Sequence, residues 1–130
     1  MKHKESQLQI SCVRWFRMQY PHFKRNLFAI PNGGNRSLIT ASILKAEGTL
    51  AGVADLMLAV PRNEFHAMFI EMKYGKNDLS ESQQEFKKAV EKYGYRHVTC
   101  RTFEEFKREI ESYLGIKWGR MIEQLGGYNG

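Results

Sequence analysis

Hydrophobic residues along the chain change their spacing several times, and these changes predict the order of helices and strands. A spacing of three to four residues, typical of a helix with one buried side, runs over four segments, 4–19, 37–47, 80–93 and 102 to about 114. Short apolar runs typical of strands lie between them, at 26–31, 55–60, 68–73 and 95–100. The resulting order, α-β-α-β-β-α-β-α, predicts an α/β sandwich.

Residues at the segment ends support the helix predictions. Ser37 is placed to cap the second helix and Gly48 to end it. The sequences Ser-x-x-Gln at 80–83 and Thr-x-x-Glu at 102–105 both have the spacing of a capping box. One side of the second helix is apolar, at Ile39, Ile43 and Ala46. The third helix is expected to turn four residues inward, Phe86, Ala89, Val90 and Tyr93.

The last segment, 115–130, is rich in glycine, and its apolar residues have only a weak helical spacing. We predict one domain over residues 1–114 and a C-terminal tail over 115–130, which is either a weak helix or partly ordered. The apolar residues of the tail are predicted contacts with a second copy of the chain, namely Trp118, Met121, Ile122 and Leu125.

Charged residues interrupt the two central apolar runs, and a hairpin would bring them together. Asp55 opens the first run, and Glu71 and Lys73 close the second. A hairpin that turns about Asn63 places Asp55 opposite Glu71, and Lys73 shares the face of Glu71 because alternate residues of a strand point the same way. Two carboxylates beside an ammonium are the groups that a divalent metal and an activated water need for phosphodiester cleavage.

Each of these residues also has a purely structural interpretation. Asp55 follows Gly52-Val-Ala and has the position of an ordinary turn residue, while Glu71 and Lys73 fit an edge strand with one polar side. The three together favour a site, because a buried carboxylate costs several kcal/mol unless it is paired or binds a metal.

Other polar residues have two interpretations as well. Gln83 is explained by the capping box, and Glu5 by the helix macrodipole. The loop from Asn32 to Arg36 offers a glycine-rich backbone and a guanidinium that can hold a phosphate, but it also suits a plain turn. Basic residues near the third helix form either a solvated face or a surface that follows DNA phosphates. The predicted DNA contacts are Asn32, Arg36, Lys76 and Lys87.

Size and charge narrow the class of protein. The chain has 130 residues, enough for one domain, and its net charge of +6 favours an anionic polymer as partner. No apolar stretch approaches the roughly 20 residues that span a bilayer, and the N-terminus lacks the apolar core of a signal peptide. Cys12 and Cys100 have no metal-binding spacing, so we expect reduced core thiols in a cytoplasmic protein.

The order of these motifs resembles the VRR-NUC family, a branch of the PD-(D/E)xK nuclease superfamily. The resemblance covers about residues 5 to 100, and its matching stretches are Glu5, Pro31–Arg36, Leu44–Gly48, Gly52–Leu56, Phe69–Lys73, Leu79–Gln83 and the glycine before the next strand. Ala54 stands where a proline usually precedes the aspartate, which concerns local backbone geometry and not the ligands.

The resemblance implies a restriction-endonuclease-like core, with a small mixed sheet flanked by helices. Mg²⁺ or Mn²⁺ would be bound by Asp55, Glu71, Glu5 and the backbone carbonyl of Met72. Lys73 would orient the attacking water or stabilise the transition state, and Gln83 would complete the site. Small members of this kind are similar to phage or bacterial homodimers that cut branched DNA such as four-way (Holliday) junctions. A phage-encoded protein would act in the host cytoplasm.

Two other classes of function stay open. One is a catalytically silent DNA-binding module on the same fold, and the intact residues Asp55, Glu71, Lys73 and Gln83 argue against it. The other is a basic interaction protein, such as a phage factor that binds host machinery, which would have no metal affinity. Cleavage of a labelled junction and a labelled duplex, with Mg²⁺ or Mn²⁺ and with EDTA, separates the nuclease from both.

Overall fold

Helices and strands follow one another in the predicted order in the computed structural model, which describes residues 2–31 and 37–115. A short 3-10 helix, η1, is added after the first helix. The elements are α1 (Lys2–Gln19), η1 (Pro21–Phe23), β1 (Leu27–Ala29), α2 (Leu38–Ala46), β2 (Leu56–Leu58), β3 (Met68–Met72), α3 (Glu81–Glu91), β4 (Arg96–Cys100) and α4 (Phe103–Leu114). The loop with Asn32 and Arg36 and the apolar residues of the tail lie outside the described residues.

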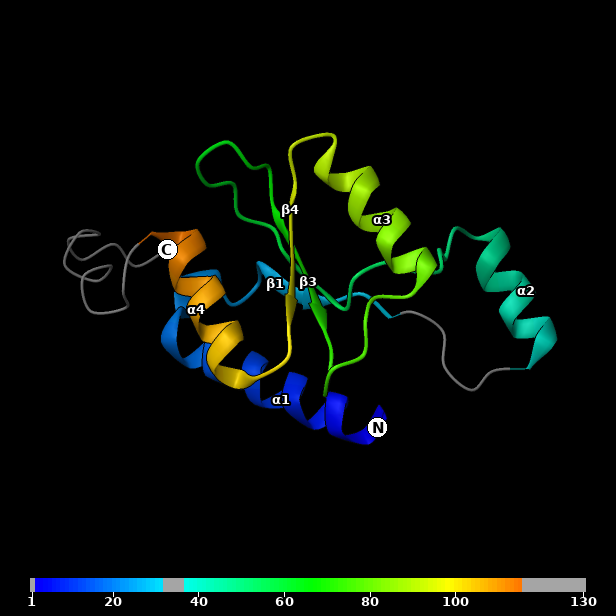
Figure 1. Ribbon diagram of the computed structural model, residues 1–130, viewed down its shortest axis with the longest axis horizontal. Coiled ribbons are helices and arrows are strands. Elements are labelled where there is room, and N and C mark those ends of the chain that lie inside the picture. Colours follow the sequence, from blue (N-terminus) through cyan, green and yellow to red (C-terminus); the bar gives the residue numbers. More distant parts are fainter. Residues whose placement is uncertain (1, 32–36, 116–130) are drawn as a thin grey trace.

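The four strands form one mixed sheet in the order β1-β2-β3-β4. The first three strands pair antiparallel, and β4 runs parallel to β3 after the crossover through α3. Helices α1 and α4 lie together against one face of the sheet, and α3 lies against the other (Figure 1). The predicted α/β fold, a small mixed sheet flanked by helices, is therefore confirmed.

The β2–β3 hairpin has the register that the charged residues predicted. Leu56 lies opposite Ile70, so one step further along the two strands brings Asp55 opposite Glu71. The tip is a tight turn in which Asn63 adopts a positive φ of 54°, a conformation that asparagine tolerates well. The tip pairs Arg62 with Phe65, one residue out of step with the strands, so the first arm contains one residue more than the second.

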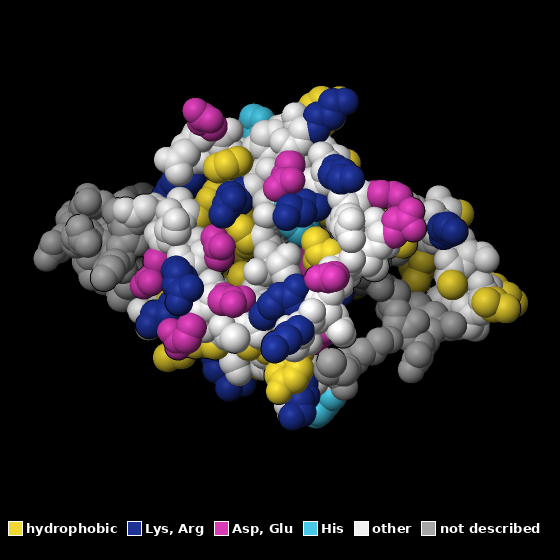
Figure 2. Space-filling model, in the orientation of Figure 1, with side chains coloured by type: hydrophobic (Ala, Val, Ile, Leu, Met, Phe, Trp, Pro, Cys, Tyr) yellow, Lys and Arg dark blue, Asp and Glu magenta, His cyan; other side chains and the backbone are white. Residues whose placement is uncertain are grey.

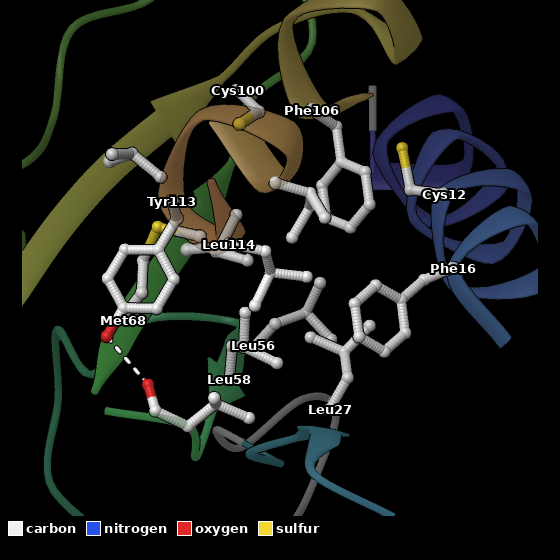
Figure 3. Packing of buried hydrophobic residues seen from close by; sticks show 14 of the residues in the cluster. Cys12, Phe16, Leu27, Leu56, Leu58, Met68, Cys100, Phe106, Tyr113 and Leu114 are labelled. Carbon is white, nitrogen blue, oxygen red and sulfur yellow. Dashed lines mark hydrogen bonds between the residues drawn. The ribbon is translucent and has the colours of Figure 1, made fainter. Parts of the chain in front are cut away.

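The core lies between the sheet and the pair α1 and α4 (Figure 3). Phe16 from α1 and Phe106 from α4 are fully buried there, against side chains such as Leu56 and Ile70. Burying each of these side chains stabilises the fold by about 1.5–3 kcal/mol. The Tyr113 hydroxyl, which is buried as well, donates a hydrogen bond of 2.7 Å to the Val60 carbonyl.

Both cysteines belong to this core. Cys12 and Cys100 are free thiols without exposed surface, as the sequence predicted. Burial raises the pKa of each thiol to about 12, so neither is a thiolate at neutral pH.

The opposite face of the sheet is covered by a narrow stripe of α3. The Phe86 ring packs edge-on against Phe69 at 5.0 Å and lies 6.0 Å from the ring of His97. The predicted inward positions of Ala89 and Tyr93 are wrong, since both are exposed, Tyr93 to 69%. A helix that touches a sheet along one line buries residues one turn apart and leaves those beside the line in water.

Helix α2 stands apart from the rest of the structure (Figure 1). Its N-cap is the predicted one, because the Thr40 N–H donates to the Ser37 hydroxyl oxygen at 3.1 Å. None of its residues is buried, and its apolar side is exposed at Leu38, Ile39 and Ile43. Hydrophobic side chains are visible on this end of the molecule in Figure 2. No helix among the described residues is long and apolar enough to cross a membrane.

His97 is buried under α3, and neither of its ring nitrogens has a hydrogen-bond partner among the described residues. Burial, with a smaller effect of the Lys87 charge, lowers the pKa of His97 from 6.5 to about 4. Between these two values the unfolded chain binds a proton that the folded protein does not. Stability should therefore fall as the pH falls from about 6.5 to about 4.

We predict that the free energy of unfolding of His97→Leu falls less between pH 7 and pH 4.5 than that of the wild type, by on the order of 1–2 kcal/mol. Urea unfolding at pH 7 and at pH 4.5 measures the change. The matched variant His3→Leu replaces an exposed histidine of α1 and should keep the full loss. Equal pH dependence in His97→Leu and the wild type would contradict the assignment of this loss to His97.

Candidate active site

Two carboxylates meet where β2 begins and β3 ends. Asp55 immediately precedes β2, and its Oδ2 accepts a hydrogen bond of 2.7 Å from the Met72 N–H at the end of β3. Glu71, the residue before Met72, is only 4% exposed. Its neighbours in the strand are also buried, so the polar residue that interrupts this apolar run is held inside the protein and not at an edge.

The two carboxyl groups strongly influence each other. Burial, followed by the charge of Asp55, raises the pKa of Glu71 to about 8. Burial also raises the pKa of Asp55, although the Met72 N–H and Glu71 act in the other direction. The protein therefore keeps two acidic groups together in a place where both cannot easily carry a charge, an arrangement typical of functional sites.

The residues of this pair fit a divalent cation. Glu71 Oε1 is buried and has no hydrogen-bond partner among the described residues. A buried acceptor without a partner costs about 1–3 kcal/mol, and a cation would remove that cost together with the repulsion between the carboxylates. Within the described residues no group of three His, Cys, Asp or Glu side chains is gathered for a metal, so the side-chain ligands here are the pair itself.

Gln83 connects α3 to the pair and caps its own helix at the same time. Its amide nitrogen donates to Glu71 Oε2 at 3.1 Å, while its amide oxygen accepts from the Ser80 N–H at 2.9 Å. The Ser80 hydroxyl completes the capping box by accepting from the Gln83 N–H. The structural and the functional interpretation of this residue are thus compatible, because each uses a different atom.

Gly52 holds the loop before Asp55 against the start of α3. It has a φ of +90°, and a Cβ added to it would overlap the main-chain carbonyl of Ser82. A side chain at this position would therefore strain the loop and push away the first turn of α3, which carries Gln83. The sequence reasoning missed this role, although a glycine three residues before the aspartate was a signal for it.

Lys73 and Glu5 lie close enough to change the electrostatics of the pair. The charge of Lys73 lowers the pKa of both carboxyl groups, and the charge of Glu5 raises both. Glu5 extends from α1, and its Oε2 accepts from the Tyr74 N–H at 3.3 Å. The structure therefore brings Asp55, Glu71 and Gln83 together, with Lys73 and Glu5 near enough to act through their charges, while the roles of all five stay predictions.

The predicted DNA-binding residues do not form one cluster as the acidic residues do. Lys76 is exposed in the turn that follows β3, and Lys87 is half-buried on α3, where its charge acts on His97. Basic and acidic side chains alternate on the face seen in Figure 2, so this side carries no continuous basic surface over the drawn side chains.

A groove of about 680 Å³ starts at Asp55 and Met72 and follows α1. Apart from Glu5, the sequence analysis did not single out its lining residues on that helix. Their signal is a second stripe at helical spacing, which carries Gln9, Arg14 and Arg17 beside the stripe that enters the core.

An α/β domain with a buried acidic pair on its central hairpin, an adjacent lysine and a helix-borne glutamine has the layout of a nuclease-type domain. The chain belongs to the VRR-NUC family, because the VRR-NUC domain model matches residues 2–104. A solved structure described as a VRR_NUC domain protein is similar in fold, with a TM-score of 0.76 and 22% sequence identity over 87% of this chain and 89% of that chain. No curated protein matches the chain.

Two variants separate the capping role of the Ser80–Gln83 pair from its contact with Glu71. Gln83→Glu keeps an oxygen for the Ser80 N–H but replaces the donor to Glu71 by a third carboxylate, so we expect it to lower cleavage at least 10-fold, on the scale of losses behind metal ligands. Ser80→Ala removes the hydroxyl cap, costs about 1 kcal/mol and leaves the Gln83–Glu71 hydrogen bond in place, so cleavage should persist.

The measurements are thermal unfolding and the rate of DNA cleavage for both variants. The prediction requires that each variant change one of the two quantities far more than the other. Wild-type cleavage by Gln83→Glu would reduce Gln83 to a helix cap.

Proposed function

We propose that the chain is a divalent-metal-dependent endodeoxyribonuclease that hydrolyses phosphodiester bonds at the Asp55–Glu71 pair. The observation that carries the proposal is the acidic pair itself, a buried Glu71 with one unpartnered oxygen beside a half-buried Asp55, in a chain of the VRR-NUC family. A DNA-binding module without activity has no need of a buried, repulsive acidic pair, because carboxylates facing phosphates weaken binding.

Asp55, Glu71 and the Met72 carbonyl would hold Mg²⁺ or Mn²⁺, with Glu5 acting from α1. When bound, the cation supplies positive charge against the phosphate and lowers the pKa of a coordinated water. Gln83 keeps the Glu71 carboxylate in one orientation through its amide N–H. Asp55 is held in the same way by the Met72 N–H, so both ligands are in place before the substrate arrives.

Lys73 would act on the phosphate itself. Its ammonium orients the attacking water and stabilises the negative charge that grows on the phosphate oxygens as the water oxygen bonds to phosphorus and the sugar oxygen leaves. The backbone of Lys73 is fixed by the hydrogen bond of 3.0 Å from its N–H to the Cys100 carbonyl. Its side chain is half-buried, which limits the positions that the ammonium can take.

We expect Asp55→Asn and Glu71→Gln each to lower cleavage of labelled DNA by more than the roughly 10–100-fold that is typical of changes behind a metal ligand. The fold should persist, because both variants are isosteric and the new Asn keeps an oxygen for the Met72 N–H. Mn²⁺ should raise the unfolding temperature of the wild type but not of these variants.

Glu104→Gln is the matched control, since it removes an exposed carboxylate from the first turn of α4. It should cut DNA and respond to Mn²⁺ as the wild type does. DNA binding without cleavage by the wild type, at any Mg²⁺ or Mn²⁺ concentration, would favour the silent module instead. Absence of both metal and DNA binding would favour the interaction protein.

The finer part of the proposal is a homodimer that acts on branched DNA such as a four-way junction. Cutting a junction productively takes two incisions related by symmetry, and a two-fold dimer holds two sites in a fixed relation. The exposed apolar side of α2 supports a second copy as its partner. A helix of nine residues is not stable in water by propensity alone, so α2 needs a surface to pack on, and the same side of a second α2 is self-complementary.

Ile39→Asp should therefore convert the dimer into a monomer and reduce the preference for junctions over linear duplex, because a charge would enter an apolar contact. Light scattering at micromolar concentration measures the assembly. Ala41→Asp is the matched control, since position 41 lies on the other side of the same helix, about 200° away. A wild-type monomer, or a dimer insensitive to Ile39→Asp, would contradict this interface.

A further inference from the structure

The groove along α1 leads from the acidic pair to two arginines. Asp55 and Met72 line one end together with Glu5, and Arg14 and Arg17 line the part near the C-terminal end of the helix. In Figure 1, α1 runs along the lower edge of the molecule, with its N-terminal half below the end of β3. The groove is therefore continuous with the candidate active site and extends in one direction from it.

The lining changes its chemistry along the helix. Next to the acidic end lie Ser6 and Gln9, which can donate hydrogen bonds, and beyond them Ile10, which is 53% exposed. The guanidinium groups of Arg14 and Arg17 are exposed, and neither makes a hydrogen bond or ion pair with a described residue. The two guanidiniums can bind phosphates of a nucleic-acid strand, and the polar and apolar residues between them and the acidic end can contact its sugars.

The spacing agrees with such a strand. Arg14 and Arg17 follow Glu5 by nine and twelve residues, which places them about 14 and 18 Å further along the helix axis. A strand that lies extended along the groove covers these lengths within a few nucleotides, so the two arginines would meet phosphates near the cut. No aromatic side chain is among the described lining residues, so the groove offers contacts to the backbone and no surface for stacking bases.

We propose that the α1 groove binds one DNA strand on one side of the scissile phosphate, and that Arg14 and Arg17 hold phosphates of this strand a few nucleotides away from the cut. The inference rests on the proposed nuclease function and adds to it the path of the substrate. Helix α1 would then position the DNA through contacts with the DNA backbone, independently of base sequence.

Substrates with flanks shortened stepwise on either side of the cut test the path. Wild-type kcat/KM should fall at least 10-fold once the flank on one side, shortened within the first few nucleotides, no longer reaches Arg14 and Arg17, and should be insensitive to the same change on the other side. Methylphosphonates placed one at a time along that flank remove single phosphate charges, and the one at a phosphate held by the arginines should reproduce the loss. In the double variant R14A/R17A the gain from the long flank, and the effect of the methylphosphonate, should disappear.

Binding of a fluorescent single strand in EDTA gives a readout that does not depend on catalysis. Each lost phosphate contact lowers the salt dependence, log Kd against log salt, by about 0.7 for a single strand, so R14A/R17A should lose roughly 1.4 of this slope. K107A/R108A is the matched control, because it removes the same net charge from α4, which does not line the groove. It should keep both the slope and the flank dependence.

The outcomes separate this inference from the function on which it rests. Absence of cleavage on every substrate would contradict the nuclease function. Cleavage that ignores flank length on both sides, or equal loss of slope in R14A/R17A and K107A/R108A, would leave the nuclease intact and overturn the groove as the strand path.

Discussion

Asp55 connects three strands at one point, and the geometry of the candidate site depends on this connection. Its main-chain carbonyl accepts a hydrogen bond of 2.9 Å from Ile30, just beyond β1, and its carboxylate accepts from the N–H of Met72 in β3. The side chain thus takes the place of a main-chain partner where β2 has not yet begun. One residue therefore closes the end of the sheet and also presents an acidic group beside Glu71. The same carboxylate that holds the strands together belongs to the candidate site.

The position of Glu71 has a cost that only a ligand or a proton removes. Its carboxyl is buried next to Asp55, and Gln83 donates a hydrogen bond to only one of its two oxygens. Such a pair contributes little to stability, because desolvation outweighs the attraction from Lys73. A protein usually keeps a destabilising buried pair where that pair does work, which is why the pair carries more weight here than the basic charge of the chain does.

Sequence reasoning predicted the sheet well where charged residues marked its register. Asp55 and Glu71 fixed the hairpin, since a shift of one residue between the two strands would have placed their side chains on opposite faces of the sheet. Capping signals gave the helix starts at Ser37 and Ser80. These features are local, and spacing along the chain is sufficient to predict them.

Features that depend on tertiary contacts were harder to predict. The exposure of Tyr93 and Ala89 follows from the angle at which α3 crosses the sheet, which periodicity does not contain. At the start of α4, the Glu105 carboxylate accepts from the Arg101 N–H at 2.7 Å, so only the Thr102 half of the predicted capping box forms. The groove beside α1 borders the edge strand β1 at Ala29, and the second stripe of α1 does not by itself show what lies opposite it.

The contact at Gly52 has a further consequence for how the site can vary. There the loop that precedes Asp55 touches the first turn of α3, which carries Gln83. The two main chains are in direct contact, with no side chain between them. Because no side chain sets this spacing, substitutions around it cannot adjust it in small steps. The distance between the loop that carries Asp55 and the helix that carries Gln83 is therefore a fixed dimension of the backbone, and the absence of a side chain at position 52 determines it.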